Sequence, residues 1–422
     1  MVLPTVSRAK QPHLQLIGVI SFLVAGTILR LLWAADMEWK WEEQWMFQQA
    51  QQIAAGAIPL PVGGIQSSIG IPNPGMGVWC FAVIAKFAKD PVAMVRGVQI
   101  LNILPIWFFF GFVVKNIPKS NWNPWLWGLA IASVNPIAIV LSRKLWIPDI
   151  MAPFCLLIFL GHWFRKKFWG SFLWGIAAIS SGQIHMGGFF LTLGLFCWTI
   201  YHDYHKNTLK KVAWEGWILG TIIGSIPFIC WLWEVFPQRQ GSRSSILGLL
   251  VPKFYIQWLT GALGINLSYS LKDFFWSDFL REPLIFGFPT YLMIPAHLFL
   301  VGVGIYPFYR WFKSRNYSRP KKSELSFYLK AIGFGVGGAF TLAAVNVPPY
   351  YIAVVFPYPY LWLAKLYQNK IKILVVIALM QLLISFTFLS FIHRTGGIPF
   401  EGSGYGMSYR FQMTEKMPEL VN

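Results

Sequence analysis

The chain has 422 residues, of which 56% are hydrophobic and only 12% are charged, whereas an ordinary soluble domain carries roughly 25% charged residues. This composition, together with a mean hydropathy of +0.52, excludes a soluble globular enzyme and a disordered chain. The net charge of +19 does not predict a nucleic-acid partner, because basic residues of membrane proteins gather in cytoplasmic loops beside anionic lipid. We therefore expect an all-α, polytopic helical membrane protein with a single integral-membrane domain over residues 1–422.

The first apolar run covers residues 14–33 and follows Arg8 and Lys10. It is long enough to cross a bilayer and no small-residue cleavage site follows it, so it predicts an uncleaved signal anchor with a cytoplasmic N-terminus. Residues 34–95 then predict an external loop with several acids and a Pro/Gly-rich stretch. Within this loop, residues 76–87 are apolar but too few to span the membrane, and they predict an interfacial helix.

Ten further apolar runs bring the expected number of transmembrane helices to about eleven. They cover residues 95–114, 125–141, 150–164, 168–181, 187–201, 212–235, 283–308, 327–345, 350–367 and 371–391. If residues 76–87 also crossed the bilayer, the basic loop 310–322 would lie outside, against the positive-inside rule. The external face then also collects a short loop, 142–149, a long loop, 236–282, and a glycine-containing C-terminal tail, 394–422.

Three acids on this external face are candidates for catalysis. Glu42 and Glu43 stand among tryptophans just after the first span, where one would act as general base and the other would position a substrate. A solvated helix start is the alternative, since acids suit the N-terminal end of the helix dipole. Asp149 follows Pro148 at the outer end of two spans, where it either caps a helix or joins the other carboxylates.

Basic residues on the same face are candidates for binding a phosphate. Arg143 and Lys144 lie in the short external loop, and Arg239 and Arg243 follow the seventh span. Paired cations hold phosphate oxygens by charge-assisted hydrogen bonds, while contact with lipid headgroups is the alternative for both pairs. His185 also lies at an outer helix end, as either a site residue or a structural histidine.

Other motifs are absent from the sequence. It holds no Walker loop, no HExxH and no GxSxG, and its four cysteines are isolated in apolar runs. Inverted halves of matching length are also absent, which weakens a transporter interpretation. Carboxylates and cations at one outer interface instead suit sugar transfer from a lipid-linked phosphosugar: a base takes the proton of an acceptor hydroxyl, and the cations stabilise the phosphate that leaves.

Several short motifs follow one another in a characteristic order, mainly along the first 200 residues. They are a span ending in Arg30, the acidic pair in Trp41-Glu42-Glu43, the turn Asn73-Pro74-Gly75, Arg96, Asn135-Pro136, Ser142-Arg143, Asp149, Gly182-Gln183-Ile184-His185 and, later, Pro349-Tyr350-Tyr351. This order resembles bacterial membrane glycosyltransferases of the C-type fold, in the protein O-mannosyltransferase and aminoarabinose transferase group (glycosyltransferase family 39-like). Glu42 stands where that group usually has Asp, and the turn replaces its His-Pro-Pro.

The resemblance implies a polyprenyl-phosphate sugar donor and an external, inverting transfer in a bacterial inner (plasma) membrane. It implies that Glu42 is the base, with Glu43 as the alternative, and that Gln183, His185 and Tyr350 contact substrate. No cofactor is expected, although two or three carboxylates would suffice for a divalent cation such as Mg²⁺ or Mn²⁺.

The sugar and the acceptor stay open, the latter being protein, lipid or glycan. Three rival functions also stay open. They are a transporter or flippase of lipid-linked sugars, a polymerase or ligase of lipid-linked glycans, and a non-catalytic scaffold.

Overall fold

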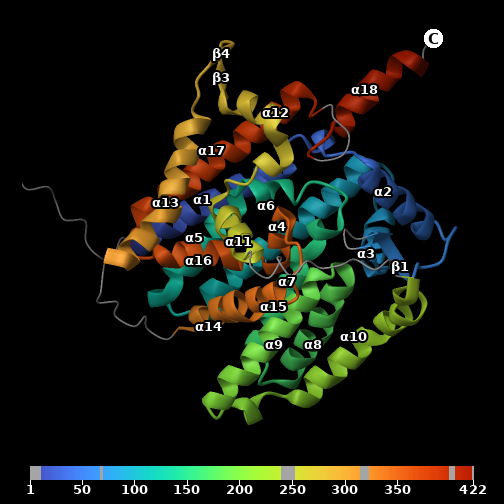
Figure 1. Cartoon of the computed structure of the whole chain (residues 1–422), viewed down its shortest axis with the longest axis vertical. Helices are drawn as coiled ribbons and strands as arrows, with labels where there is room; N and C mark the ends of the chain where they lie inside the picture. Colours follow the sequence, from blue (N-terminus) through green and yellow to red (C-terminus); the bar gives the residue numbers. More distant parts are fainter. Residues whose placement is uncertain (1–10, 67–69, 239–251, 314–322, 399–403, 421–422) are drawn as a thin grey trace, which may run out of the picture.

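The computed structural model describes residues 11–66, 70–238, 252–313, 323–398 and 404–420, and most of these residues are helical (Figure 1). In this part of the chain, strand pairing is confined to two short antiparallel hairpins and two isolated bridges. The hairpins pair β1 (Gly63–Gln66) with β2 (Pro72–Pro74), and β3 (Leu284–Ile285) with β4 (Phe288–Pro289). The prediction of an all-α protein is therefore confirmed.

Among the described residues, four helices are long and apolar enough to cross a membrane. They are α4 (Pro91–Asn116), α10 (Trp214–Glu234), the continuous helical stretch Glu324–Leu342, and α17 (Ile371–Thr395). Shorter apolar helices cover Gln15–Leu31, Met76–Ala85, Ile147–Trp163 and Met293–Pro307. These helices give the chain the character of a membrane protein. The expected total of eleven crossings does not follow from these lengths and stays a prediction.

The first half of the chain alternates helices with short connections. Its remaining elements are α1 (Gln11–Leu31), η1 (Ala34–Asp36), α2 (Trp41–Ala54), α3 (Met76–Ala85), η2 (Lys119–Asn121), α5 (Trp122–Val134), α6 (Pro136–Val140), η3 (Ile147–Ile150) and α7 (Met151–Trp163). The short helix expected at residues 76–87 is present as α3, ten residues long. Pro136 begins α6 after Asn135, whose side chain accepts a hydrogen bond from the Ala138 N–H and caps the helix.

The second half continues the same pattern. Its remaining elements are α8 (Phe168–Ile184), α9 (Gly187–His205), η4 (Leu209–Lys211), η5 (Phe236–Gln238), α11 (Lys253–Leu263), α12 (Ser268–Leu280), α13 (Met293–Lys313), α14 (Glu324–Lys330), the π-helix η7 (Ala331–Val336), α15 (Gly337–Leu342), η8 (Pro349–Val355), α16 (Tyr358–Leu366) and α18 (Tyr409–Leu420). The described residues of the expected loop 236–282 thus include the helices α11 and α12, and α11 packs against α13, α15 and α16.

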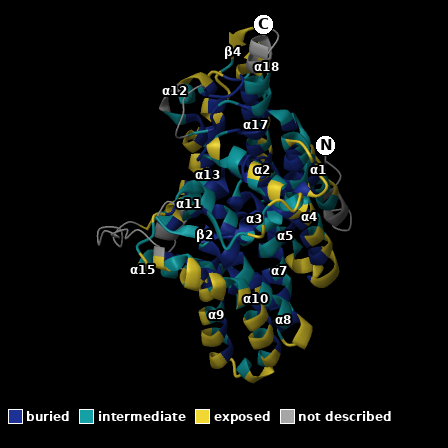
Figure 2. Cartoon of the chain, turned by 90° about the vertical axis from the view of Figure 1, so that its right-hand side faces the viewer, coloured by how far each residue is buried: buried dark blue, intermediate teal, exposed yellow. Residues whose placement is uncertain are grey.

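The core of the molecule surrounds α5, where every residue from Pro124 to Val134 is buried. This helix packs against α1, α4, α16 and α17. In Figure 2 the buried residues fill the middle of the molecule, whereas α8, α9 and α10 extend from it with exposed outer faces. Only 22% of the apolar window of α10 is buried, compared with 50% for α17. An apolar helix this exposed is suited to contact with lipid.

Glycines bring α8 and α10 close together. Gly216 and Gly220 of α10 are buried, and an added Cβ at Gly220 would lie 2.2 Å from the Phe172 carbonyl oxygen of α8. An added Cβ at Gly175 of α8 would lie 2.3 Å from the Trp217 carbonyl oxygen. Small residues spaced by four are a common interface between helices in membranes. The opposite face of α10 exposes Ile218, Ile222, Ile226 and Ile229.

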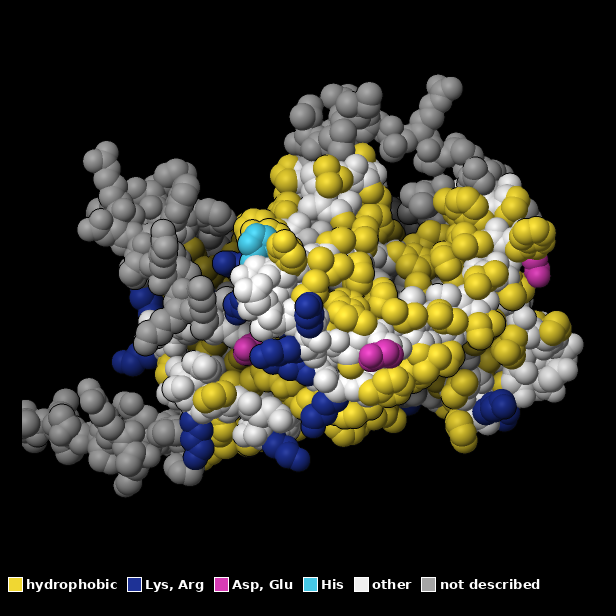
Figure 3. Space-filling view, turned by 90° about the horizontal axis from the view of Figure 1, so that it is seen from below, with side chains coloured by type: hydrophobic (Ala, Val, Ile, Leu, Met, Phe, Trp, Pro, Cys, Tyr) yellow, Lys and Arg dark blue, Asp and Glu magenta, His cyan; other side chains and the backbone are white. Residues whose placement is uncertain are grey.

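Basic residues gather where α7 meets α8 and where α9 meets α10. These two connections hold Arg165, Lys166, Lys167, Lys206, Lys210 and Lys211. Figure 3 shows this side of the molecule as a mostly hydrophobic surface, with most of its Lys and Arg side chains toward the left. The end of α1 meets the first turns of α4 through Arg96, and η3, which leads into α7, and the end of α8 both lie against Gly77 of α3, away from these connections.

Candidate active site

The C-terminal end of α1 is held by two arginines, one from the connection between α6 and η3 and one from α4. The Arg143 guanidinium donates to the carbonyl oxygens of Leu29, Arg30 and Trp33 at 2.8 Å each. Arg96 of α4 donates to the Leu31 carbonyl oxygen at 2.5 Å. The last carbonyls of a helix have no partner within the helix, and cations stabilise them. Arg143 was predicted to bind a donor phosphate, but these three contacts make it part of the framework.

The segment after α1 is held by the C-terminal part of the chain. Asp36 is buried, and its carboxylate accepts from Arg410 Nε and contacts His393 Nδ1, both at 2.5 Å. The Tyr405 hydroxyl donates to the Asp36 carbonyl oxygen at 2.6 Å. Glu38 forms an isolated bridge with Ser408. The residues that follow α17 therefore hold residues 36–40 in place.

A buried ion pair lies at the centre of this region. Lys144 Nζ lies 2.9 Å from Glu38 Oε2, and the two side chains are 9% and 3% exposed. Lys40 pairs with the other oxygen of Glu38 and also donates to the Gly404 carbonyl oxygen at 2.7 Å. Burial opposes the charge of Lys144, but Glu38 outweighs it and holds the pKa of the ammonium above its ordinary value. Lys144 is therefore a fixed positive charge.

Glu43 and Asp149 add two buried carboxyl groups to this pair. Glu43 Oε2 accepts from the Lys40 N–H at 3.0 Å and so caps the start of α2, while Oε1 has no partner in the described residues. Asp149 Oδ2 accepts from the Lys144 N–H at 3.3 Å, and in the same part of the chain Oδ1 has no partner. Burial, and then the charge of Glu38, raise the pKa of Glu43 to about 7. We call Glu38, Glu43, Lys144 and Asp149 the carboxylate–lysine cluster.

Glu42 stands beside this cluster and differs from it in access. It occupies the first turn of α2 and is half-buried, whereas Glu43 is 1% exposed. Among the described residues, the Glu42 side chain makes no hydrogen bond and no ion pair. A carboxylate that is open on one side and flanked by buried charge is able to accept a proton from a molecule that enters.

Aromatic rings connect the cluster with two other predicted residues. Lys144 Nζ lies 4.0 Å from the ring centre of Trp146, which packs edge-on against Tyr350 with ring centres 4.5 Å apart. The His185 ring lies 6.3 Å from that of Tyr350. Burial lowers the pKa of His185 to about 4, and its Nδ1 accepts from the Gly187 N–H, so the neutral ring carries its proton on Nε2. One ring, that of Trp146, therefore lies between Lys144 and Tyr350, and two rings lie between Lys144 and His185.

Other predicted residues lie apart from the cluster. Gln183 is buried and donates to the Gly224 carbonyl oxygen at 2.7 Å, so it joins α8 to α10. Arg239 and Arg243 fall outside the described residues. No group of three or more His, Cys, Asp or Glu side chains suited to a metal ion occurs in the described ranges.

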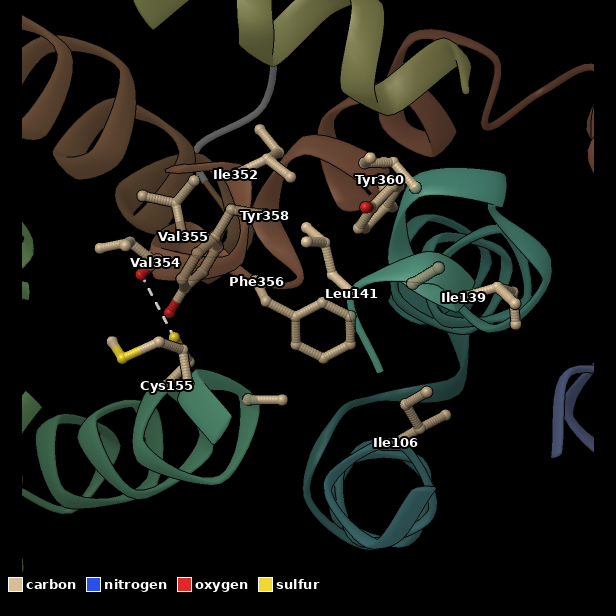
Figure 4. Packing of buried hydrophobic residues seen from close by; sticks show 14 of the residues in the cluster. Ile106, Ile139, Leu141, Cys155, Ile352, Val354, Val355, Phe356, Tyr358 and Tyr360 are labelled. Atoms are coloured by element: carbon tan, nitrogen blue, oxygen red, sulfur yellow. Dashed lines mark hydrogen bonds between the residues drawn. The ribbon is translucent and has the colours of Figure 1, made fainter. Parts of the chain in front are cut away.

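A cavity inside the bundle lies next to the Asp149 turn. Apolar residues of α6, α7 and η8 line it together with Arg30, Asn102 and Tyr360. Figure 4 shows Leu141, Ile352, Phe356 and Tyr360 converging on this region. Asn102 donates to the Asp149 carbonyl oxygen at 2.6 Å, so the cavity wall and the cluster share a hydrogen bond.

Sequence reasoning missed several residues that build the site. Glu38 and Lys40 stand four and two residues before Glu42, among several other charges of that loop. Tyr405 and Arg410 belong to a tail whose glycines predicted an irregular segment. The one available signal was the acidic residue in Met37-Glu38-Trp39, close to the end of an apolar helix.

The comparisons with known proteins do not add a relative to this description. The sequence matches no protein-family model and no curated protein, and the fold matches no solved structure.

Proposed function

We propose that the protein is a membrane glycosyltransferase that moves a sugar from a polyprenyl-phosphate donor to an acceptor hydroxyl. The observation that carries this proposal is the open carboxylate of Glu42 next to the buried carboxylate–lysine cluster at one end of an apolar helix bundle. Buried ionisable residues at the end of membrane helices are costly and are typical of functional sites. The motif order along the chain supports the same class of enzyme.

Glu42 is the proposed general base. It takes the proton of the acceptor hydroxyl as that oxygen attacks the anomeric carbon of the donor sugar. The bond between this carbon and the phosphate oxygen breaks, and the phosphate leaves with the electron pair, so attack from the opposite face inverts the sugar. Glu43 and Asp149 are nearly enclosed and act as positioning residues, because each has one oxygen free to accept a hydroxyl hydrogen bond.

Positive charge near Glu42 stabilises the leaving phosphate in this mechanism. Lys144 is fixed by Glu38, and Lys40 is the more open of the two lysines, with 28% of its side chain exposed. Two cations beside a phosphate lower the energy of the charge that develops on it. Arg143 is assigned to the framework in this proposal, since its two terminal nitrogens donate to carbonyl oxygens at and after the end of α1. Arg239 and Arg243 remain candidates for the same phosphate.

The orientation in the membrane is part of the proposal. Asp149 of the cluster directly precedes α7, and Arg165 follows α7 and contacts the connection that holds Lys211, so the cluster and these basic connections lie at opposite ends of α7. The positive-inside rule then places the basic end in the cytoplasm and the cluster on the external face. Eleven crossings, a cytoplasmic N-terminus, the C-type fold and a bacterial plasma membrane belong to the same proposal. His185 and Tyr350 are proposed to contact the sugar or the acceptor.

The cavity beside Asp149 supports a second candidate, a transporter or flippase of lipid-linked sugars. Arg30 lies in an apolar helix and lines this cavity, and a buried cation within a membrane helix is typical of a substrate pathway. Glycosyl transfer is preferred because Glu42 and the cluster lie at the helix ends, where an acceptor from water has access.

A transfer assay with the reconstituted protein tests the proposal. Polyprenyl-phosphate sugars are supplied with a panel of hydroxyl acceptors, and labelled product is measured for the wild type and for Glu42→Gln. We expect transfer to fall by about 10²–10⁴-fold, the usual contribution of a general base. Glu215→Gln is the matched control, because Glu215 is an exposed acid at the other end of the bundle. Unchanged transfer by Glu42→Gln would remove Glu42 as the base.

A further inference from the structure

The β3–β4 hairpin presents an apolar tip to its surroundings. All six residues of the segment Leu284–Pro289 are exposed, and five of them are apolar. Phe286 is 97% exposed and Phe288 is 75% exposed. Two neighbouring phenylalanines with this exposure are unfavourable in water, because each leaves most of its apolar surface in contact with solvent.

The backbone conformation of the hairpin tip is unfavourable for the phenylalanine at position 286. Phe286 has φ 52° and Gly287 has φ 85°, so both central residues of the turn lie in the left-handed region. Two-residue hairpins with this geometry prefer Asn-Gly, and a bulky residue at positive φ is strained. A phenylalanine at the first position therefore costs conformational energy and leaves its ring exposed, which indicates that the ring has a partner.

The base of the hairpin is fixed at the end of a membrane-length helix. Thr290 Oγ1 donates to the Pro283 carbonyl oxygen at 2.8 Å, and the Leu284 N–H donates to Glu282 Oε2 at 3.1 Å. Glu282 also pairs with Arg394, in the last turn of α17. Since α17 is long and apolar enough to cross a bilayer, its last turn lies at the level where the hydrocarbon ends and the headgroups begin.

The apolar surface of the hairpin continues onto the next helix. α13 begins four residues after the hairpin, and its Leu298 and Ile305 are 66% and 60% exposed. Figures 1 and 2 both place the hairpin at the periphery of the molecule, beyond the first turn of α13. The exposed aromatic turn and the exposed apolar face of the helix that follows it form one continuous apolar surface suited to contact with lipid.

We propose that the hairpin Leu284–Pro289 is an interfacial anchor that inserts Phe286 and Phe288 into the boundary between headgroups and acyl chains. Aromatic residues favour this boundary, and burial there removes the apolar surface of both rings from water. The fixed base keeps the hairpin ready for insertion, because little conformational entropy is lost when it enters the lipid. This role does not depend on the proposed transferase activity.

Photocrosslinking in phosphatidylcholine nanodiscs tests the anchor. Phe286 is replaced by p-benzoylphenylalanine, the sample is irradiated, and the protein is analysed by mass spectrometry for added lipid mass. Leu298 of α13 is the lipid-facing reference, and Thr414, which is exposed on α18, is the water-facing reference. The same replacement is made at both reference positions. We expect the lipid adduct yield at position 286 to be similar to the yield at position 298. It should be at least about tenfold above the yield at position 414, a ratio that corresponds to about 1.4 kcal/mol.

Two outcomes would overturn the proposal. A yield at position 286 as low as that at Thr414, with Leu298 still labelled, would show that the hairpin stays in water. A crosslink from position 286 to a second copy of the protein, in place of lipid, would make the hairpin a protein contact. The same replacement at Phe288 gives a second, independent measurement with the same expected result.

Discussion

Two groups of buried charge lie at opposite ends of α7 and are satisfied to different degrees. At the basic end, the Asp203 carboxylate accepts from Arg165 Nε at 3.2 Å and Nη2 at 3.1 Å, and contacts His202 Nδ1 at 3.0 Å. At the other end, the carboxylate–lysine cluster leaves Glu43 Oε1 and Asp149 Oδ1 without a partner among the described residues. The carboxylate oxygens of Asp203 thus both have partners, whereas two carboxyl oxygens of the cluster have none among the described residues.

The pKa directions follow the same difference. Burial opposes the charge of Asp203, but His202 and Arg165 outweigh it and hold the pKa of this carboxyl below its ordinary value. Burial and Glu38 raise the pKa of Glu43 instead. A fully paired carboxylate stabilises a fold, whereas a buried carboxyl group with a free oxygen is costly unless a ligand or a reaction uses it. We therefore interpret the Asp203 group as framework and the cluster as site.

The largest expected effect on stability comes from removing the cation of the cluster. Lys144→Met leaves Glu38 buried beside only Lys40, and we expect the free energy of unfolding to fall by about 3–5 kcal/mol. Thermal unfolding in detergent, followed by tryptophan fluorescence, measures this loss. The double variant Lys144→Met/Glu38→Gln removes both charges and should recover much of the loss. If the double variant were no more stable than the single one, the pair would not be coupled.

The next effect is a pH dependence of stability, which should differ between the carboxylate–lysine cluster and the Asp203 group. The pKa of Glu43 is raised from 4.5 to about 7 in the folded protein, so its contribution to stability is fully present below pH 4.5 and is lost as the pH rises through 7. This loss is on the order of 3 kcal/mol at most. Melting curves from pH 4 to 8 should show a smaller decline for Glu43→Gln than for the wild type. Parallel curves for the two proteins would contradict the raised pKa.

Asp203→Asn should give the opposite pattern. Because the folded pKa of Asp203 is lowered, its stabilisation is present above its unfolded pKa and is lost as the pH falls through the folded value. At neutral pH we expect a loss of about 1.5–3 kcal/mol, typical of hydrogen bonds to a charged group. Sugar transfer, measured at a temperature where the variant is folded, should be unchanged. A specific loss of transfer by this variant would place chemistry at the wrong end of the molecule.

Gln183 tests the boundary between framework and site. Its amide joins α8 to α10 through the Gly224 carbonyl oxygen, so Gln183→Leu should lower stability by about 1 kcal/mol and leave the KM for the donor unchanged. Steady-state kinetics and melting measured on the same preparation give both values. A higher KM with normal stability would return Gln183 to the substrate site, the role that the motif resemblance implies.

Local patterns in the sequence predicted much of the fold. Hydropathy located the helices that became α1, α4, α10 and α17, and the shortness of the apolar run at residues 76–87 predicted the ten-residue α3. The predicted alternation of helix direction also placed Glu43, Lys144 and Asp149 on the same face of the membrane, because each of them follows or precedes a predicted span. These features depend on short stretches of chain, so the residues that determine them lie close together in the sequence.

The rest depends on contacts between distant residues. Arg143 was expected to bind phosphate, but the carbonyls that it caps belong to a helix more than 100 residues earlier. Tyr405 and Arg410 reach Asp36 from the opposite end of the chain, across more than 350 residues. The close approach of α8 and α10 depends on which faces their glycines share. No local pattern fixes such pairings.

Native mass spectrometry of the intact protein with its co-purifying lipids tests the central proposal most directly. We expect a bound species with the mass of a polyprenyl phosphate or of its sugar derivative, and weaker binding of added polyprenyl phosphate by Lys40→Gln than by the wild type. Lys115→Gln serves as the control, since Lys115 is a basic residue at the other end of α4. If only bulk phospholipid is bound, even after polyprenyl phosphate is added, the cluster is not a site for a lipid-linked sugar.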